Sequence, residues 1–256
     1  MRFDIVTLFA EMFAPLAACG ISRRAHDMGL WQMSFWNPRE FALDRHRTVD
    51  DRPFGGDEGM VMKVAPIFLA LERLAGSRPE AKRRVIVASA QGKLFDQATA
   101  LHLAQYDEVV LISGRYEGID ERVTEHLADE EISVGSFVLS GGEWAAGMIV
   151  DAVARLVPGV LGNEASSVHE SFAPAADGAY GVLDFPHYTR PAEFRGWKAP
   201  EVLLSGDHQK IRRWRRKTAL AKTKRNRPDL LESASLTEED RALLAEIEAD
   251  EATSPF

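Results

Sequence analysis

Apolar residues recur with two different periods in the first 160 residues of the chain. Short apolar or alternating runs predict strands, as where Trp31, Met33 and Phe35 alternate with polar neighbours. Helical spacing predicts helices at residues 96–104 and 142–156, the second closed by Pro158 and Gly159. The predicted strands are residues 3–8, 31–36, 84–88, 108–112, 132–134 and 137–139. Strand, helix and strand in this order indicate crossover units, and so an α/β fold with a parallel sheet.

The pattern changes after residue 161. Residues 162–181 are rich in Gly, Ala, Ser and Asp, which is typical of a linker that can move. Beyond Pro200 the spacing is helical to the end of the chain. We therefore predict three parts: a domain over residues 1–161, a flexible linker over 162–181, and a small helical C-terminal domain over 182–256.

Two local patterns refine the helical part. Ile211, Trp214, Thr218 and Leu220 are spaced to form the inner stripe of one helix. Residues 237–240 are typical of a helix start, in which Thr237 caps the helix and Asp240 reaches back to it.

Composition narrows the class of protein. With 256 residues and 45% hydrophobic content, the chain can form a substantial core. The single cysteine, Cys19, excludes an intramolecular disulfide and a cysteine-rich zinc site, and it suits the cytoplasm. No stretch approaches the roughly 20 apolar residues of a membrane span, so we expect no membrane association. The seven histidines have no metal-ligand spacing, so no metal-ligating residues are predicted.

Charge is distributed unevenly along the chain. The formal net charge is −8, but residues 210–227 carry +10 with no acid among them, which leaves −18 for the rest. Such asymmetry directs a polyanion to one surface. The predicted RNA contacts come from this segment and from the His-Tyr-Thr-Arg cluster before it; they are Arg212, Arg215, Arg216, Lys217, His187 and Arg190.

Two glycine-bearing loops follow predicted strands, at residues 113–120 and 133–143. The first can be a tight turn with a helix cap at Asp120, and both can be simple connections. Alternatively, the two loops line one small-molecule pocket at the carboxyl ends of parallel strands. Neither loop is a dinucleotide fingerprint or a phosphate-binding P-loop. Arg155, at the end of an apolar helix, can offset the helix dipole or act in a site.

Six segments in order resemble one family, the bacterial tRNA (guanine-N(1))-methyltransferases of the SPOUT superfamily, over nearly the whole chain. The segments are Asp50-Asp-Arg-Pro-Phe-Gly-Gly, Ser113-Gly-Arg-Tyr-Glu-Gly-Ile-Asp-Glu-Arg, Val138-Leu-Ser-Gly-Gly-Glu, Val157-Pro-Gly-Val-Leu-Gly, Pro186-His-Tyr-Thr-Arg-Pro and Leu203-Leu-Ser-Gly-Asp-His. The resemblance implies a SPOUT-type parallel sheet with a deep trefoil knot. It also implies a homodimer with each active site across the interface, and a C-terminal domain that grips the tRNA anticodon stem-loop.

The same resemblance implies a reaction and its residues. A methyl group passes from S-adenosylmethionine to ring nitrogen 1 of the guanosine at tRNA position 37, with Mg²⁺ required through ligands that the sequence does not identify. Glu170 matches the general base, and Arg155 matches the arginine that stabilises charge on the guanine. The implied cofactor contacts are Gly114, Glu117, Ser133, Val134, Gly135, Phe137, Leu139, Gly141 and Ala90.

The chain departs from the family pattern at several positions. Glu170 stands where the family usually has Asp, and Ala90 replaces the proline of a Ser-Pro-Gln-Gly loop. Trp144 and Ala145 also differ from the usual Leu and Pro, and these changes bear on cofactor affinity. Two alternatives remain: a related knotted methyltransferase for another RNA, and a binding module without activity. Retention of Arg155 with a carboxylate at 170 argues against the second.

Overall fold

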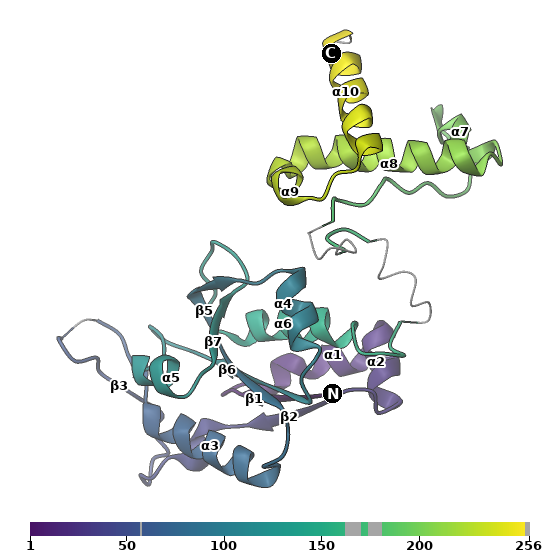
Figure 1. Ribbon diagram of the computed structural model, residues 1–256. Helices are drawn as coiled ribbons and strands as arrows, with labels where there is room; N and C mark the ends of the chain where they lie inside the picture. Colours follow the sequence, from purple (N-terminus) through teal and green to yellow (C-terminus); the bar gives the residue numbers. More distant parts are fainter. Residues whose placement is uncertain (57, 162–169, 174–180, 254–256) are drawn as a thin grey trace. The chain divides into compact units, whose positions relative to one another are not determined.

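The computed structural model describes residues 1–56, 58–161, 170–173 and 181–253, which form two compact units (Figure 1). Unit 1 spans Met1–Glu164 and unit 2 spans Ala165–Phe256. This boundary falls inside the segment that the sequence marks as a linker. Most of that segment, residues 162–169 and 174–180, lies outside the described residues, so the three-part division stays a prediction.

A parallel sheet of five strands forms the centre of unit 1, in the order β2-β1-β6-β5-β7. The strands are β1 (Arg2–Val6), β2 (Gln32–Trp36), β5 (Arg83–Leu94), β6 (Glu108–Ser113) and β7 (Glu130–Ser133). Each neighbouring pair runs parallel. All residues of the middle strand β6 are buried, because both faces of the sheet are covered.

Helices cover the two faces of the sheet (Figure 1). Val109 and Leu111 of β6 pack into one buried cluster, and Val110 and Ile112 pack into the other, because successive side chains alternate. The first cluster involves η1 (Ala10–Phe13), α1 (Ala14–Ala18), α2 (Gly20–Asp27), α4 (Gln97–Leu103) and α6 (Glu143–Ala154). The second involves α3 (Val64–Ser77) and α5 (Glu121–His126), and η2 (Pro38–Phe41) packs against α3. A small antiparallel ribbon, β3 (Asp50–Asp51) with β4 (Val61–Met62), accompanies them.

The predicted α/β fold with a parallel sheet is confirmed, and five of the six predicted strands are present within a few residues. The strand predicted at residues 137–139 is wrong. Phe137, Val138 and Leu139 are all exposed, and the Phe137 amide donates to the Gly135 carbonyl at 2.9 Å, so the segment is a loop. Strand β5 also continues past the predicted end, with a register irregularity between Ala88 and Lys93. Passage of the chain through a knot stays a prediction.

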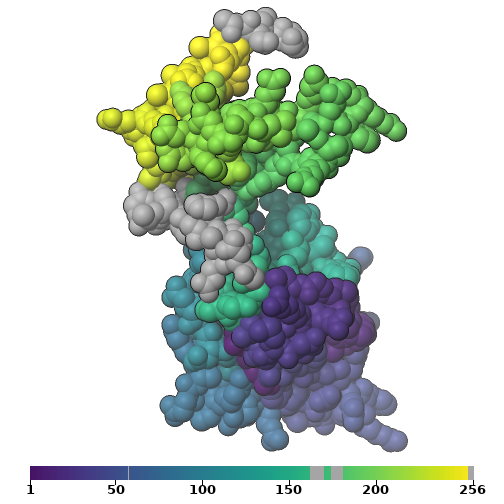
Figure 2. All heavy atoms as spheres, turned by 90° about the vertical axis from the view of Figure 1, so that its right-hand side faces the viewer, coloured from purple at the N-terminus to yellow at the C-terminus, as the bar shows by residue number. Residues whose placement is uncertain are grey.

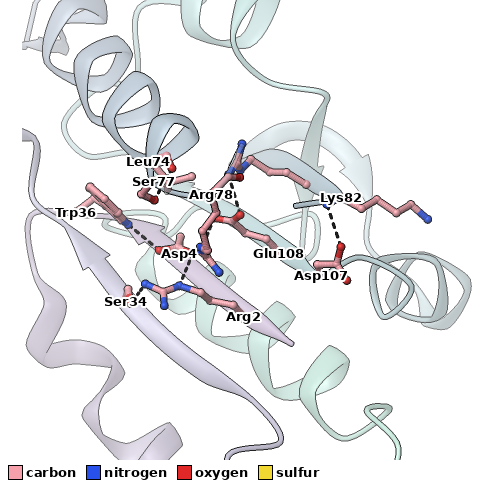
Figure 3. A network of polar contacts seen from close by, with 11 residues as sticks. Arg2, Asp4, Ser34, Trp36, Leu74, Ser77, Arg78, Lys82, Asp107 and Glu108 are labelled. Carbon is pink, nitrogen blue, oxygen red and sulfur yellow. Dashed lines mark hydrogen bonds and ion pairs between the residues drawn. The ribbon is translucent and has the colours of Figure 1, made fainter. Parts of the chain in front are cut away.

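The amino ends of the central strands carry a buried ion-pair network (Figure 3). Asp4 of β1 and Glu108 of β6 are both fully buried. One Nη of Arg78 lies 2.8 Å from Asp4 Oδ2 and 2.8 Å from Glu108 Oε1. Arg2 pairs with Asp4 at 2.9 Å, and Arg83 pairs with Glu108 at 2.9 Å. Three guanidinium groups therefore compensate two buried carboxylates, which a low-dielectric interior requires.

The pKa values of the two carboxylates in this network are shifted in opposite directions. Burial raises the pKa of Glu108, and a hydrogen bond to Asp4 raises it further. Burial opposes ionisation of Asp4 too, but hydrogen bonds from Trp36, Glu108 and Arg2 outweigh burial and lower its pKa. When the pair takes up a proton, the proton therefore goes to Glu108 first.

Unit 2 is helical, as the sequence predicts for residues beyond Pro200 (Figure 1). Its helices are α7 (Glu201–Leu204), α8 (His208–Asn226), α9 (Pro228–Ser233) and α10 (Glu238–Thr253). A short hairpin, β8 (Glu193–Phe194) with β9 (Trp197–Lys198), precedes them. The core contains Val182, Ala219, Leu220, Leu243 and Ile247.

Local details of unit 2 agree in part with the sequence. The Asp240 amide donates to Thr237 Oγ1 at 3.1 Å and Asp240 Oδ2 accepts from the Thr237 amide at 2.9 Å, so the predicted capping box is confirmed. The predicted inner stripe of α8 is only partly right. Leu220 is fully buried, but Ala219 and Thr223 complete the buried stripe, while the other three predicted positions are half-buried. The 19-residue helix is long enough for its contact face to rotate as it passes the core.

In the parts of the chain that the structure describes, no helix combines the length and apolar character needed to cross a membrane.

Candidate cofactor pocket and nucleic-acid surface

A cavity of about 240 Å³ opens at the carboxyl ends of β5, β6 and β7. This is slightly below the roughly 300–1,000 Å³ of typical small-molecule pockets, and the cavity is open to solvent on one side. The loops after β6 and β7 supply much of its lining, and the rest comes from the part of β5 between Val87 and Gln91 and from α5 and α6. All nine residues predicted to contact the cofactor line it: Ala90, Gly114, Glu117, Ser133, Val134, Gly135, Phe137, Leu139 and Gly141. The two glycine loops identified in the sequence therefore meet at one pocket.

Close backbone approach explains a glycine at position 142. The Gly142 amide donates to the Gly114 carbonyl at 2.8 Å, so the two loops are joined directly. A Cβ at position 142 would lie 2.9 Å from Ser113 Cα and 3.0 Å from the Gly114 nitrogen. Those neighbours are backbone atoms and cannot move aside as a side chain can. Any larger residue at position 142 would push the two loops apart.

The segment from Met60 to Met62, for which the sequence suggested no role, supports the first glycine loop. The Glu117 amide donates to the Met60 carbonyl at 3.0 Å, and the Met62 amide donates to the Gly118 carbonyl at 2.9 Å. The Asp120 amide then donates to the Met62 carbonyl at 2.9 Å. Asp120 also caps α5, as the simpler interpretation of this loop predicts. The loop is thus both a capped turn and a wall of the pocket.

A buried charge pair, also missed by sequence reasoning, supports the second glycine loop. Arg115 Nε lies 2.9 Å from Glu143 Oε2, close enough for an ion pair but not aligned as a hydrogen bond. The other Glu143 oxygen accepts from the Thr7 hydroxyl at 3.0 Å. Arg115 also donates to the Ser140 carbonyl at 3.1 Å and lies over the Phe9 ring. This one guanidinium therefore connects the second loop to α6 and to the segment that follows β1.

Charges around the pocket favour a ligand with positive charge. Three acidic residues, Glu117, Glu121 and Glu131, are among those that line the pocket, together with Arg115. Since Arg115 is already paired with Glu143, the lining has an excess of negative charge. A cationic ligand therefore fits this lining better than a polyphosphate does.

The two residues predicted to act in catalysis belong to different units. Arg155 is the C-cap of α6 in unit 1, and its amide donates to the Asp151 carbonyl at 3.3 Å. Glu170 belongs to unit 2, and its carbonyl accepts from the Ala173 amide at 3.1 Å. The Phe172 amide donates to the Val182 carbonyl at 3.4 Å, so the short segment carrying Glu170 is attached to the core of unit 2. Each unit thus holds one member of the predicted pair.

Helix α10 neutralises one side of the basic helix α8. Arg216 forms hydrogen-bonded ion pairs of 2.6 and 2.9 Å with the two oxygens of Asp240, which is almost fully buried. Lys217 lies 2.7 Å from Asp250 and 3.4 Å from Glu246. In Figure 2 the yellow atoms of α10 lie against the green atoms of unit 2, and Figure 1 shows α10 crossing α8. Two of the six predicted RNA contacts therefore face carboxylates of their own unit.

The other four predicted RNA contacts are exposed. Arg212 and Arg215 lie on α8, and His187 and Arg190 lie in the segment before the hairpin. The Arg215 guanidinium lies 4.8 Å from the centre of the Phe185 ring, and the His187 ring lies 4.6 Å from the same ring. The His187 Nε2 is 3.0 Å from Asp184 Oδ2. The Phe185 ring therefore contacts both the Arg215 guanidinium and the His187 imidazole at one surface of unit 2.

No cluster of three or more His, Cys, Asp or Glu side chains suited to a metal ion occurs within residues 1–56, 58–161, 170–173 and 181–253. The expected magnesium requirement therefore has no ligands assigned to it.

A glycine-walled pocket at the carboxyl edge of a parallel sheet is typical of α/β domains that bind a small molecule. A family model described as "tRNA (Guanine-1)-methyltransferase TrmD" matches residues 1–233. The chain belongs to this family of enzymes.

Curated relatives agree over nearly the full length. A protein of Koribacter versatilis named tRNA (guanine-N(1)-)-methyltransferase is 53% identical, with 97% of this chain and 99% of the relative covered. A protein of the same name from Geobacter metallireducens is 52% identical, covering 97% and 98%. One from Brevibacillus brevis is 50% identical, covering 98% and 99%. The resemblance found from the motifs is thereby confirmed.

Proposed function

We propose that this protein transfers a methyl group from S-adenosylmethionine to ring nitrogen 1 of the guanosine at tRNA position 37, in the cytoplasm. Membership of the family supports the guanine methyltransferase activity. The observation that carries the cofactor assignment is the pocket itself, because all nine residues expected to bind the cofactor line one cavity. The excess of carboxylates in its lining also suits a ligand with a sulfonium and an amino group.

When bound, S-adenosylmethionine supplies an electrophilic methyl group on sulfur. The protein holds that group with loops whose backbones are fixed by hydrogen bonds, such as the contact from Gly142 to Gly114. Rigid loops contribute to rate because methyl transfer is an in-line displacement that needs the donor and acceptor atoms in register. Gly135 has φ +156°, and its backbone shape leaves no room for a Cβ beside the Phe137 ring.

Nitrogen 1 of guanine carries a proton at neutral pH and is a poor nucleophile. In the proposed mechanism, the Glu170 carboxylate accepts this proton as the nitrogen lone pair forms a bond to the methyl carbon and the carbon–sulfur bond breaks. As the proton leaves, and before the bond to the methyl carbon is complete, negative charge builds up on the guanine carbonyl oxygen. The Arg155 guanidinium stabilises that charge, which lowers the barrier. The products are neutral 1-methylguanine and a neutral thioether.

The substrate and the assembly follow from the family and from surface features. We propose that unit 2 binds the anticodon stem-loop through its exposed cations, Arg212 and Arg215 among them. We also propose a homodimer with each active site across the interface. Trp144 and Met148 lie one turn apart on α6 and are 55% and 53% exposed, which supports a second copy covering this face. Mg²⁺ is proposed as a requirement of the reaction, without assigned ligands.

The direct test is methyl transfer from labelled S-adenosylmethionine to two tRNA transcripts. The transcripts differ only at the nucleotide 3′ of the anticodon, which is guanosine in one and adenosine in the other. Incorporation into the guanosine transcript alone is expected. Equal incorporation into both would place the methyl group elsewhere, and saturable binding without incorporation would favour another RNA substrate or a binding module.

The role of Glu170 is tested with Glu170→Gln and Glu170→Asp. The amide cannot accept the proton, so we expect turnover to fall by at least about 100-fold. Cofactor affinity, measured by calorimetry, stays unchanged because Glu170 is not among the residues of unit 1 that line the pocket. Glu170→Asp keeps the carboxylate and should retain substantial turnover. Unchanged turnover in Glu170→Gln would assign the base to another residue.

A further inference from the structure

The hairpin of unit 2 exposes two aromatic rings that do not serve the core. Phe194 is 54% exposed and Trp197 is 72% exposed. Among the residues that the structure describes, neither ring belongs to the buried cluster formed by Leu220, Leu243 and their neighbours. Exposed large aromatic side chains in a small unit carry a solvation cost, so their position calls for a role in binding.

The hairpin backbone holds these rings in a fixed arrangement. Phe194 and Trp197 are directly opposite each other in the antiparallel pair, so both point to the same face. Arg195 and Gly196 form the turn with φ values of +53° and +82°, the left-handed geometry that suits a two-residue hairpin. The Ala199 amide donates to the Ala192 carbonyl at 2.8 Å and extends the ladder by one step.

The rings form an aromatic pair with a cation beside it. Their centres are 6.1 Å apart, with 50° between the planes, and the Arg195 guanidinium carbon is 5.4 Å from the Phe194 centre. A tilted pair leaves ring surface free on the solvent side. An arginine beside an exposed aromatic ring adds a second flat group on which a nucleic-acid base can stack.

Charge and composition of the surrounding surface favour RNA as the occupant. Every residue from 187 to 198 is exposed. Within this run, Arg190, Arg195 and Lys198 are cationic, and Glu193 is the one acid. Leu, Ile, Val and Met do not occur in it, so the run lacks the aliphatic core of a typical protein interface. Aromatic rings interleaved with cations are instead the composition of surfaces that bind unpaired nucleotides.

We propose that Phe194, Arg195 and Trp197 form a platform on which an unpaired base of the tRNA substrate stacks. This inference rests on the proposed function, since it takes tRNA as the partner of unit 2. The platform positions the RNA and takes no part in methyl transfer. Because stacking depends on the face of a base and not on its edge, the platform contributes affinity with little preference for sequence.

The test compares tRNA affinity of the full-length protein with that of Trp197→Ala and Trp197→Phe. Stacking on one base contributes about 1–3 kcal/mol to binding, so Trp197→Ala should raise the dissociation constant for tRNA by about tenfold. Trp197→Phe keeps a flat ring and should retain most of the affinity. Leu43→Ala, which removes an 88% exposed side chain in unit 1, is the matched control and should have no effect.

Salt dependence distinguishes stacking from charge. The slope of log affinity against log salt should be unchanged in Trp197→Ala, because no phosphate contact is lost. Quenching of tryptophan fluorescence by RNA should decrease in Trp197→Phe, since the stacked indole is removed. Affinity within twofold of the parent protein in Trp197→Ala would overturn the platform. A change in sedimentation of that variant would instead assign the rings to a protein interface.

A second probe separates this inference from the proposed function. Short oligoadenylate offers unpaired bases without tRNA structure. One outcome is that the parent protein does not methylate tRNA, while the Trp197→Ala variant binds oligoadenylate more weakly than the parent does. In that case the platform stands and the proposed function fails. If methylation succeeds and both RNAs bind equally well to the variant, the platform alone is wrong. Failure of the parent protein to bind either RNA would overturn both.

Discussion

The two ends of the sheet in unit 1 treat polar groups in opposite ways. At the amino ends, Asp4 and Glu108 are fully buried and are compensated by three arginines (Figure 3). At the carboxyl ends, glycine-rich loops surround a cavity of about 240 Å³. The same strands therefore end in a closed charge network on one side and an open pocket on the other.

This difference shows how one sheet can separate stability from binding. Charged groups that satisfy one another hold segments together but have no capacity left for a ligand. The loops at the other end are fixed mainly by backbone hydrogen bonds, such as that from Gly142 to Gly114. They therefore leave a cavity between them, and acidic residues that line it can interact with a ligand. Substitutions at the amino ends should therefore affect unfolding, while those at the carboxyl ends should affect the cofactor and the rate.

The largest effect is expected from Gly142→Ala at the carboxyl end. The added Cβ would lie 2.9 Å from Ser113 Cα, so the two loops must separate. A displacement approaching 1 Å lowers the rate by about 100-fold, and we expect a loss of that size in methyl transfer, with weaker cofactor binding. Kinetics and calorimetry on the folded variant measure both.

Gly147→Ala is the matched control for this prediction. Position 147 is in the same helix, and a Cβ there would lie 3.8 Å from its nearest neighbour, Leu16. Removing a helical glycine should leave activity unchanged and raise stability by up to about 1 kcal/mol. Equal activity of the two alanine variants would show that loop spacing does not control the site.

Arg78→Met should act on stability and leave the pocket intact. It removes the cation that bridges Asp4 and Glu108, but Arg2 and Arg83 remain. We expect a loss of about 2 kcal/mol in the free energy of unfolding, below the roughly 3–5 kcal/mol for an uncompensated buried charge. Denaturant unfolding and cofactor titration measure the two properties.

Arg23→Met is the control for the network. Arg23 pairs with Asp27 at 3.4 Å, and both side chains are about 60% exposed, so little change in stability is expected. A large loss of cofactor affinity in Arg78→Met would contradict the separation between the two ends of the sheet.

Glu143→Gln should lower both the stability of the fold and the affinity for the cofactor, because Glu143 is a buried charge at the carboxyl end of the sheet. Its loss leaves Arg115 without its carboxylate partner. Weakening a charged contact of this kind should lower stability by about 1.5 kcal/mol. Because Arg115 also holds the Ser140 carbonyl, cofactor affinity should fall as well. An effect on stability alone would mean that the loop keeps its shape without this arginine.

The smallest effect is a pH dependence at the amino ends. The pKa of Glu108 is raised in the folded protein, so the folded state holds the proton more tightly than the unfolded chain does. Stability contributed by protonation therefore increases as pH falls from 7 toward the ordinary value of 4.5. Relative to Glu108→Gln, which cannot titrate, the parent protein should gain stability over this window. Thermal unfolding at pH 7 and pH 5 measures the difference, and a shift in favour of the variant would reverse the assigned direction.

Local sequence pattern predicted much of the fold. The β6 run of Val and Ile is continuous because it is covered on both faces, and helix α6 begins and ends within two residues of its predicted bounds. The failure at residues 137–139 has a physical reason. Short apolar runs fit a strand or a pocket wall equally well, and only a hydrogen-bonding neighbour distinguishes the two.

Sequence motifs identified the residues that line the pocket, but they did not identify the residues that hold the pocket loops in place. Glycines that follow strands are visible in the sequence, but the segment from Met60 to Met62 and the pair of Arg115 with Glu143 meet them only after folding. The predicted RNA contacts show the same limit. A run of cations is visible at α8, but its sequence does not reveal that α10 returns to neutralise Arg216 and Lys217.

The sequence by itself determined the alternation of strands and helices, the glycine loops and the family, because each depends on residues close together in the chain or on motifs in a fixed order. Tertiary structure decided which charged side chains form ion pairs within the protein and which face solvent. Asp4 meets Arg78 across 74 residues, and Arg216 meets Asp240 across 24. The free energy of such a pair depends on the distance between its charges and on burial, and both are set only when separate segments pack together.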